Sequence, residues 1–345
     1  MAVTLAQIAA AAQVSRMTVS RALRQRPRVA PEVRERVLAA AKKLGWRPDP
    51  KLSRAMTEVR ASARRVVTEK LALVWPDGDA ARVAARANLK RFREGARARA
   101  EEQGFALEEF FLETAGVSAR RLSQMIYARG MAGVVVAPVS FHAHLKLDMD
   151  WSRFPAVAVG VGLVQSGLSR VHNDHFGTIV ECLERLETRG ARRVGLVLWR
   201  ETAERLNGQL EGAFIARHPL GPEEALRLLC FLPTDGTESA LADWMRAARP
   251  DVIVGEAPEG EWIKKVARET GMRAGDTPAY ATFNWFESHA KTAGYNQRFD
   301  RIGAAAVDVA VAQYHRSERG LAVAPKTVLT KGEWVDALRL VKRRA

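Results

Sequence analysis

The chain has 345 residues, of which 47% are hydrophobic and 27% charged, which is enough apolar material for ordinary folded domains. Its two cysteines, Cys182 and Cys230, exclude a disulfide framework and fit a reducing compartment. No apolar stretch approaches the ~20 residues that span a bilayer, and no signal peptide is evident, so we expect a cytoplasmic protein without a membrane partner.

The net charge of +15 is concentrated at the N-terminus. Residues 1–65 contain 15 Lys and Arg against 4 Asp and Glu, a net charge of +11. A basic block on a compact unit is typical of proteins that bind nucleic-acid phosphates. The alternative is a solvated basic tail, but the same segment carries regularly spaced apolar residues that predict a core. These are Val3, Leu5, Ile8, Val14, Val19, Leu23, Val33, Val37, Leu38 and Leu44.

The first 45 residues predict three helices. Thr4 and Gln7 form a capping box that opens a helix ending near residue 12. After a tight turn, Ser15 caps a second helix over residues 16–23. Two short helices in this arrangement form a helix-turn-helix, whose second helix enters the major groove of DNA N-terminus first. A third helix begins at Pro31 and ends before Gly45, so the segment predicts a DNA-binding headpiece.

A hinge and a linker follow the headpiece. Trp46-Arg-Pro-Asp-Pro50 predicts a rigid turn in which Pro50 starts a further helix. Residues 60–70 are polar, contain several arginines and have no apolar face. We therefore divide the chain into a headpiece with hinge helix at residues 1–57, a linker at 58–69 and a larger unit at 70–345.

Residues 70–345 alternate short apolar runs with amphipathic segments. This alternation predicts parallel, doubly wound α/β sheets, and two successive series of it predict two lobes. The expected helices cover residues 89–103, 117–129, 177–189 and 239–248. The expected strands cover residues 71–75, 105–112, 133–137, 156–160, 194–198, 226–232, 252–255 and 279–283.

The ordered headpiece motifs resemble those of the LacI/GalR (lactose-repressor) family, and weaker motifs extend the resemblance over most of the chain. It implies a cytoplasmic bacterial transcriptional regulator, a repressor, that binds a palindromic double-stranded DNA operator as a homodimer. The motifs are Thr4-Leu-Ala-Gln-Ile8, Val14-Ser15-x-x-Thr18-Val19-Ser20-Arg21-x-Leu23, Leu44-Gly45-Trp46-x-Pro48, Val171-x-Asn173-Asp174-x-x-Gly177 and Gln297-x-Phe-x-x-Ile-Gly303.

The same resemblance implies a periplasmic-binding-protein-like (type I) domain that binds a small-molecule effector, such as a sugar, between its lobes. Lobe 1 would comprise about residues 70–171 and 297–321, and lobe 2 about residues 172–296 and 322–345. The crossovers would lie near residues 172–174, 295–297 and 321–328. The effector would shift the equilibrium between two states of the hinge, which is the basis of allosteric control.

The resemblance assigns base-reading positions to Arg16, Met17 and Arg21. An arginine can bind guanine through two parallel hydrogen bonds, and Met17 suits a thymine methyl group. The less favoured alternative is that each arginine is a generic phosphate contact. Three hydroxyl side chains, Ser15, Thr18 and Ser20, are predicted to hold phosphates. Thr4 and Arg28 complete the predicted set of DNA contacts.

The hinge departs from the family pattern. The family places a leucine where it wedges between central base pairs from the minor groove. Here that position is Ala55, which is too short to wedge, and Leu52 and Met56 flank it. Either the register is shifted so that Leu52 or Met56 inserts, or the central kink is weak; we favour the shift.

Ligands of open α/β sheets bind at the carboxyl ends of the strands, and the family has its own effector positions. Three departures from the family, Gln209 for arginine, Asn284 for aspartate and Gly160 for a carboxylate, leave the effector open. Each tryptophan can be a ligand platform or a core residue. The combined prediction is Trp75, Asp77, Ser140, Gly160, Arg205, Gln209, Glu256, Asn284, Trp285 and Gln297.

Two other functions are possible for a chain of this composition. His142 with His144, and His172 with His175, have metal-like spacing, but no thiolate or carboxylate pair accompanies them. Motifs for nucleophilic catalysis or phosphate cradling are also missing, so we expect no metal, no cofactor and no enzyme. The third possibility is a constitutive operator binder whose larger domain only dimerises. The C-terminal residues 332–345 carry no heptad repeat, which favours a dimer over a tetramer.

Overall fold

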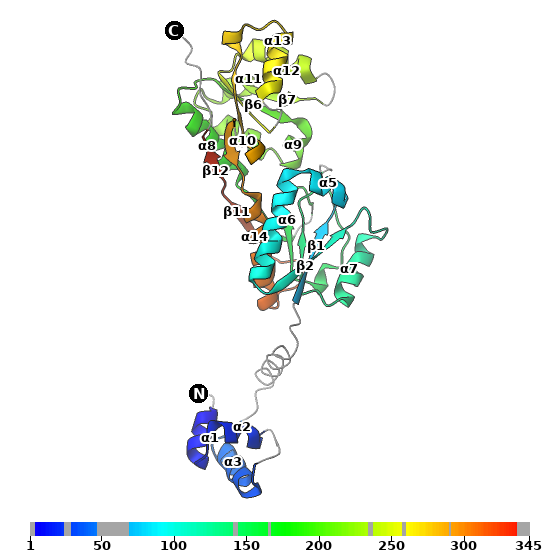
Figure 1. Cartoon of the computed structure of the whole chain (residues 1–345), viewed down its shortest axis with the longest axis vertical. Coiled ribbons are helices and arrows are strands. Elements are labelled where there is room, and N and C mark those ends of the chain that lie inside the picture. The colour runs from blue at the N-terminus through cyan, green and yellow to red at the C-terminus, as the bar shows by residue number, and fades with distance from the viewer. Residues whose placement is uncertain are drawn as a thin grey trace. The chain divides into compact units, whose positions relative to one another are not determined.

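The computed structural model describes residues 4–23, 29–46, 69–140, 144–164, 167–233, 237–256, 260–289 and 291–336. The chain forms two compact units, Met1–Val67 and Thr68–Ala345, each of which is considered by itself (Figure 1). In the described part of the chain, none of the helices combines the length and apolarity that crossing a bilayer requires.

The N-terminal unit contains the three predicted helices, α1 (Leu5–Ala12), α2 (Arg16–Leu23) and α3 (Pro31–Lys43). Their core is built on Ile8, Val19 and Val37, each fully buried, with small alanines between them that allow the short helices to approach closely. α3 ends where Gly45 adopts a left-handed conformation (φ 71°) and the Trp46 N–H donates to the Ala41 carbonyl at 2.9 Å.

Two predicted core residues of this unit are exposed. Leu38 and Leu44 are 45% and 39% exposed. Successive helical residues are rotated by about 100°, so Val37 and Ala41 turn inward while Leu38 faces solvent. Leu44 lies at the C-cap, past the last turn that packs on α1 and α2. Val3 and the side chain of Leu5 lie outside the described residues.

The C-terminal unit contains two six-stranded sheets, as the alternating pattern predicts. All strand pairs of the first sheet are parallel, and its order is β11 (Thr327–Thr330), β5 (Ser169–Asn173), β4 (Ala156–Val159), β3 (Gly133–Val136), β1 (Glu69–Trp75) and β2 (Phe105–Phe111). The second sheet is parallel except for the antiparallel edge strand β12, in the order β12 (Glu333–Val335), β10 (Ala293–Asn296), β9 (Ala279–Thr282), β8 (Val252–Gly255), β6 (Val194–Trp199) and β7 (Leu229–Leu232).

Helices cover both sheets, which explains why strands such as β3, β4 and β8 are buried along their whole length. Lobe 1 contains α5 (Ala80–Ala85), α6 (Ala87–Glu102), α7 (Ala119–Ala128), α14 (Phe299–His315) and the 3-10 helix η1 (Trp151–Arg153). Lobe 2 contains α8 (His175–Glu187), α9 (Arg200–Arg205), α10 (Gln209–Arg217), α11 (Pro222–Arg227), α12 (Thr237–Ala248), α13 (Gly260–Glu269), η2 (Ala274–Asp276) and η3 (Glu287–His289) (Figure 1).

The chain passes between the sheets three times, between β5 and α8, between β10 and α14, and between β11 and β12. The third crossover corrects the predicted lobe boundary. β11 pairs with β5 of lobe 1, with Val328 opposite Val171, so residues 327–330 belong to lobe 1 and the crossover lies at residues 331–332. The strand is short and exposed, so its apolar pattern does not identify the sheet that it joins.

A second boundary also differs from prediction. The strand expected over residues 226–232 begins only at Leu229, because Pro222 starts the short helix α11, which continues to Arg227. Proline at the first position favours this helix, and Glu223 and Glu224 in its first turn complement the helix dipole.

In lobe 1, α6 and α14 pack closely against each other, although they are more than 190 residues apart in the sequence. Gly95 of α6 lies against the backbone of Asp300, and Gly303 of α14 lies against the backbone carbonyl of Phe92. A Cβ atom at either glycine would overlap main-chain atoms, which cannot move aside as a flexible side chain can.

We predict that Gly303→Ala destabilises the C-terminal unit by about 1–3 kcal/mol, because the added methyl group must push the two helices apart. Urea denaturation measures the change. The matched control is Gly212→Ala in α10, where no atom lies within 4 Å of the added Cβ, and where alanine should be neutral or stabilise by up to about 1 kcal/mol. Equal stabilities of Gly303→Ala and the wild type would contradict the predicted close packing.

Candidate DNA-binding and effector sites

The first two headpiece helices begin at N-terminal caps that the sequence predicts. The Gln7 N–H donates to Thr4 Oγ1 at 3.4 Å, and the Thr4 N–H donates to Gln7 Oε1 at 2.8 Å, which confirms the capping box. Gln13 ends α1 in a left-handed conformation (φ 53°) and turns the chain. Ser15 Oγ then accepts a hydrogen bond from the Thr18 N–H at 3.1 Å, which fixes the start of α2.

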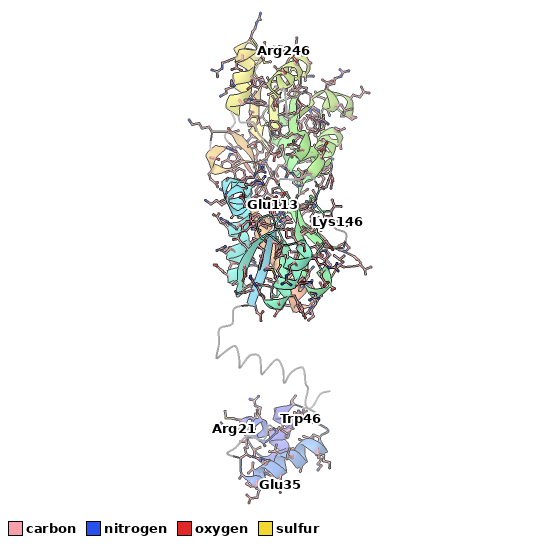
Figure 2. All side chains as sticks on the ribbon, turned by 90° about the vertical axis from the view of Figure 1, so that its right-hand side faces the viewer. Arg21, Glu35, Trp46, Glu113, Lys146 and Arg246 are labelled. Carbon is pink, nitrogen blue, oxygen red and sulfur yellow. The ribbon has the colours of Figure 1, made fainter. Side chains whose placement is uncertain are left out.

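One face of α2 is buried and the other is open. Val19 and Ala22 are fully buried in the headpiece core. Arg16, Met17 and Arg21 are exposed, and Met17 has 63% of its surface open, which is unusual for a large apolar side chain in a small unit. Figure 2 shows Arg21 at the headpiece surface, away from Glu35. The three predicted base-reading residues therefore share the accessible face.

The predicted phosphate-binding hydroxyls lie at the start of the same helix. Ser15 Oγ and Thr18 Oγ1 form a mutual hydrogen bond of 2.9 Å, and Thr18 and Ser20 are half-buried. Thr4 is exposed at the start of α1. The remaining predicted contacts lie outside the described residues and stay predictions: Arg28, Leu52, Ala55 and Met56.

In lobe 1, Asp77 links the carboxyl ends of two strands. Asp77 follows β1, is only 2% exposed, and accepts the Ser140 N–H at 3.2 and 2.9 Å from its two oxygens. Ser140 follows β3, and its carbonyl accepts a hydrogen bond from Arg86 Nη1 at 3.2 Å. The structure thus brings together two predicted residues and adds Arg86. Sequence reasoning missed Arg86 because it lies between α5 and α6 and not directly after a strand.

Trp75 is not accessible to a ligand, which corrects the prediction. Its side chain is fully buried, stacks on Phe111 with centroids 5.9 Å apart, and meets the edge of Phe92. Its indole N–H donates to Glu109 Oε2 at 2.9 Å. At the last position of β1 the indole points into the packed layer between sheet and helices, so it serves the core of lobe 1.

The loop after β4 lies close to Arg205, although the two belong to different lobes. Gly160 follows β4 with φ 77°, and its carbonyl accepts a hydrogen bond from Arg170 Nη1 at 3.3 Å. Arg205 is the last residue of α9 and donates to Thr202 Oγ1 at 3.2 Å. A Cβ atom on Gly162, in the loop after β4, would lie 3.5 Å from Arg205 Cγ, so the Arg205 stem reaches lobe 1.

Lobe 2 presents two unsatisfied acceptors at neighbouring strand ends. Glu256 follows β8 and Asn284 lies just beyond β9, and β8 and β9 are adjacent parallel strands. Glu256 Oε2 and Asn284 Oδ1 are both buried without a hydrogen-bond partner. Trp285, which follows Asn284, donates its indole N–H to the Thr292 carbonyl at 2.9 Å and is half-buried. Among the described residues, these two acceptors therefore have room for hydrogen bonds from a bound molecule.

Gln297 belongs to the framework of the crossovers. Its Nε2 donates to the Phe283 carbonyl at 2.7 Å, and its own carbonyl accepts Asn173 Nδ2 at 3.3 Å. Gln297 is 5% exposed, so its amide group is held by the protein. Gln209, the first residue of α10, is half-buried. The proposed ligand roles of both residues remain predictions.

The His172 and His175 rings stack at the first crossover, with centroids 5.7 Å apart. His172 Nδ1 lies 2.7 Å from the Asn173 carbonyl, whereas His175 Nδ1 is buried without a partner. Burial lowers the pKa of both imidazoles. Within the described ranges, no three His, Cys, Asp or Glu side chains converge as a metal site would require; His142 lies outside those ranges.

The larger unit has two surface hollows of similar volume. One of about 390 Å³ is lined by His144 of lobe 1 and by residues of α9 and α10, including Arg200 and Glu211. The other, of about 410 Å³, is lined by Met149, Trp151 and other residues before the start of β4, at the opposite end of the lobe 1 sheet from Asp77. None of the predicted effector residues is among the lining residues of either hollow.

Residues 4–49 match the family model described as bacterial regulatory proteins, lacI family. The headpiece of this chain is therefore similar to the DNA-binding segment of that family. An HTH-type transcriptional regulator of Mycobacterium tuberculosis is 31% identical over 201 residues, which are 57% of this chain and 52% of that protein. The regulator CelR of Thermobifida fusca is 28% identical over 229 residues, 62% of each chain. The chain thus spans about half the length of the curated relatives that it matches.

Solved structures support the same fold over nearly the whole chain. The transcriptional regulator CelR–cellobiose complex gives a TM-score of 0.54 at 21% identity and covers 97% of this chain and 98% of that one. The lac repressor dimer bound to operator and the anti-inducer ONPF gives 0.54 at 16% identity, with the same coverage. The curated relatives named above are described as HTH-type transcriptional regulators.

Acid is expected to destabilise the C-terminal unit through His175. Burial, aided by the charges of His172 and Arg205, lowers the pKa of His175 from 6.5 to about 3. Below about pH 6.5, His175 binds a proton in the unfolded chain but stays neutral in the folded protein. The contribution of His175 to the free energy of unfolding is therefore intact above pH 6.5 and falls as the pH drops towards 3. The loss from pH 7 to pH 5 is about 2 kcal/mol, and urea denaturation of wild type and His175→Gln measures it.

The matched control for this experiment is His315→Gln, because His315 is exposed at the end of α14. His315→Gln should retain the pH dependence of the wild type, while His175→Gln should show a shallower one. The same pH dependence in His175→Gln as in the wild type would show that His175 does not carry this proton linkage.

Proposed function

We propose that the chain is a sequence-specific transcriptional repressor that binds a palindromic operator as a homodimer and is controlled by a small-molecule effector between its lobes. The observation that carries the proposal is the open face of α2. Arg16, Met17 and Arg21 are exposed there over a buried Val19 and Ala22, within the segment that matches the family model. Such a face is suited to enter the major groove.

Shape and charge support the DNA-binding part of the proposal. Of the net charge of +15, +11 resides in residues 1–65, so the unit that carries α2 also attracts phosphates. Ser15, Thr18 and Ser20 lie beside the proposed reading residues, where hydroxyls can contact the backbone of DNA and fix its register. In the hinge, we propose that Leu52 or Met56 replaces the missing wedge at Ala55.

The effector-binding part rests on the strand ends of the larger unit. Buried acceptors without donors, Glu256 Oε2 and Asn284 Oδ1, favour a ligand over a domain that only dimerises, because a sealed structural interface would leave them unpaired. Relatives of this fold include the CelR–cellobiose complex and a lac repressor bound to operator and ONPF. We therefore propose a small hydroxylated molecule as effector, with allosteric coupling to the headpiece.

The proposed reading role of Arg16 predicts a position-specific effect. An operator is first selected in vitro from random DNA with the full chain, and a library of its single-base variants is then scored by fluorescence anisotropy. Arg16→Ala should lose about 1–3 kcal/mol of discrimination at one base pair in each half-site, because a bidentate contact to guanine is removed. Affinity at the other positions should change little.

The control is Arg246→Ala, which alters a basic residue of α12 in the other unit and should leave the operator profile unchanged (Figure 2). Uniform weakening of Arg16→Ala at every base pair would show that Arg16 contacts phosphate and does not read sequence. Occupancy without any preferred motif would reject the proposed operator-specific regulator.

A further inference from the structure

Arginines from both lobes converge on the same strand ends. We propose that the effector of this chain is a hydroxylated compound with one anionic group, a carboxylate or a phosphate, and that Arg86 of lobe 1 and Arg205 of lobe 2 bind this group between them. The inference rests on the proposed function, because it specifies the ligand of the same interlobe site.

Arg86 projects from the junction of two helices. It ends α5 and precedes α6, and in Figure 1 α5 lies at the end of lobe 1 that faces lobe 2. Its backbone N–H donates to the Val83 carbonyl, and its Nη1 donates to the Ser140 carbonyl at 3.2 Å. This contact holds the guanidinium group beside the carboxyl end of β3, and the residue remains exposed to solvent.

Arg205 reaches the same place from lobe 2. It is the last residue of α9, which lies at the end of lobe 2 that faces lobe 1 (Figure 1). A Cβ atom on Gly162 would lie 3.5 Å from Arg205 Cγ and 3.0 Å from Val139 Cβ. The next residue after Val139 is Ser140, which holds Arg86. Two cationic side chains therefore flank one short segment of lobe 1, one from each lobe.

The two guanidinium groups repel each other. The pKa of Arg86 is lowered, first by burial of part of the group and then by the charges of Arg205 and Arg82, while the carboxylates of Glu256 and Asp77 raise it. Arg205 donates to a neutral hydroxyl, that of Thr202, and this contact does not compensate its charge. An anion between the two would turn repulsion into two charge-assisted interactions and would favour approach of the lobes.

The anion cannot be the whole ligand. Glu256 Oε2 and Asn284 Oδ1, at the ends of β8 and β9, accept hydrogen bonds and are buried without donors. A carboxylate or phosphate offers them nothing, whereas hydroxyl groups donate to both. His175, which is 7% exposed and close enough to Arg205 to be affected by its charge, has a further unpartnered nitrogen, Nδ1. A sugar acid or a sugar phosphate carries both kinds of group.

The test uses the full chain and calorimetric titration at constant ionic strength. The first probe is inorganic phosphate, which should bind the wild type and bind Arg86→Gln and Arg205→Gln at least tenfold more weakly. Arg86→Lys keeps a positive charge and should recover part of the affinity. The matched control is Arg246→Gln, because Arg246 lies on α12, at the end of lobe 2 that faces away from lobe 1, and should not alter phosphate binding (Figure 2).

The second set of probes identifies the source of the charge. Gluconate and glucose 6-phosphate are compared with neutral glucose, and the proposal requires at least one of the two anions to bind more tightly than glucose, through Arg86 and Arg205. Phosphate that does not bind, phosphate binding that both variants retain, or glucose that binds as tightly as the two anions would overturn the inference. Circular dichroism confirms that each variant is folded.

Operator binding by the same preparations separates the two proposals. A wild type that binds a selected operator but lacks arginine-dependent anion binding refutes the anionic effector and leaves the regulator proposal intact. A wild type that binds anions through both arginines but no operator refutes the proposed function, and the anion site stands.

Discussion

The larger unit depends on the way its crossovers are tied to one another. The Asn173 side chain, at the end of β5, donates to the Gln297 carbonyl after β10, so two of the three passages between the lobes are linked side by side. Close by, Arg91 of α6 forms an ion pair with Glu287 of η3. These contacts hold the passages between the lobes to one another in the folded chain.

At both proposed sites, well-packed core residues fix the position of side chains that are available to bind a partner. In the headpiece, Val19 fixes α2 so that Arg16 faces outward. In the larger unit, buried strands fix Glu256 and Asn284 where their acceptors lack donors. Protein interiors rarely tolerate such groups without a role, so binding is the simplest reason for keeping them.

Local signals in the sequence predicted the elements well but predicted some side-chain directions poorly. The capping box at Thr4 and the cap at Ser15 were predictable because each involves residues three apart. Trp75 was misjudged because its position at a strand end does not reveal that Phe92 and Phe111 enclose it. Leu38 was misjudged because alanines, and not leucines, line the inner face of α3.

By itself the sequence determined the helix-turn-helix, the α/β alternation and most candidate residues, because caps, periodicity and strand ends are local properties of the chain. Only the tertiary structure decided that β11 joins lobe 1 and that Arg86 and Arg205 converge. Arg86 and Arg205 lie on different lobes, and neither local sequence indicates how far apart the two side chains are in space. Such contacts depend on how the crossovers place two independently folded sheets, which is a property of the whole chain.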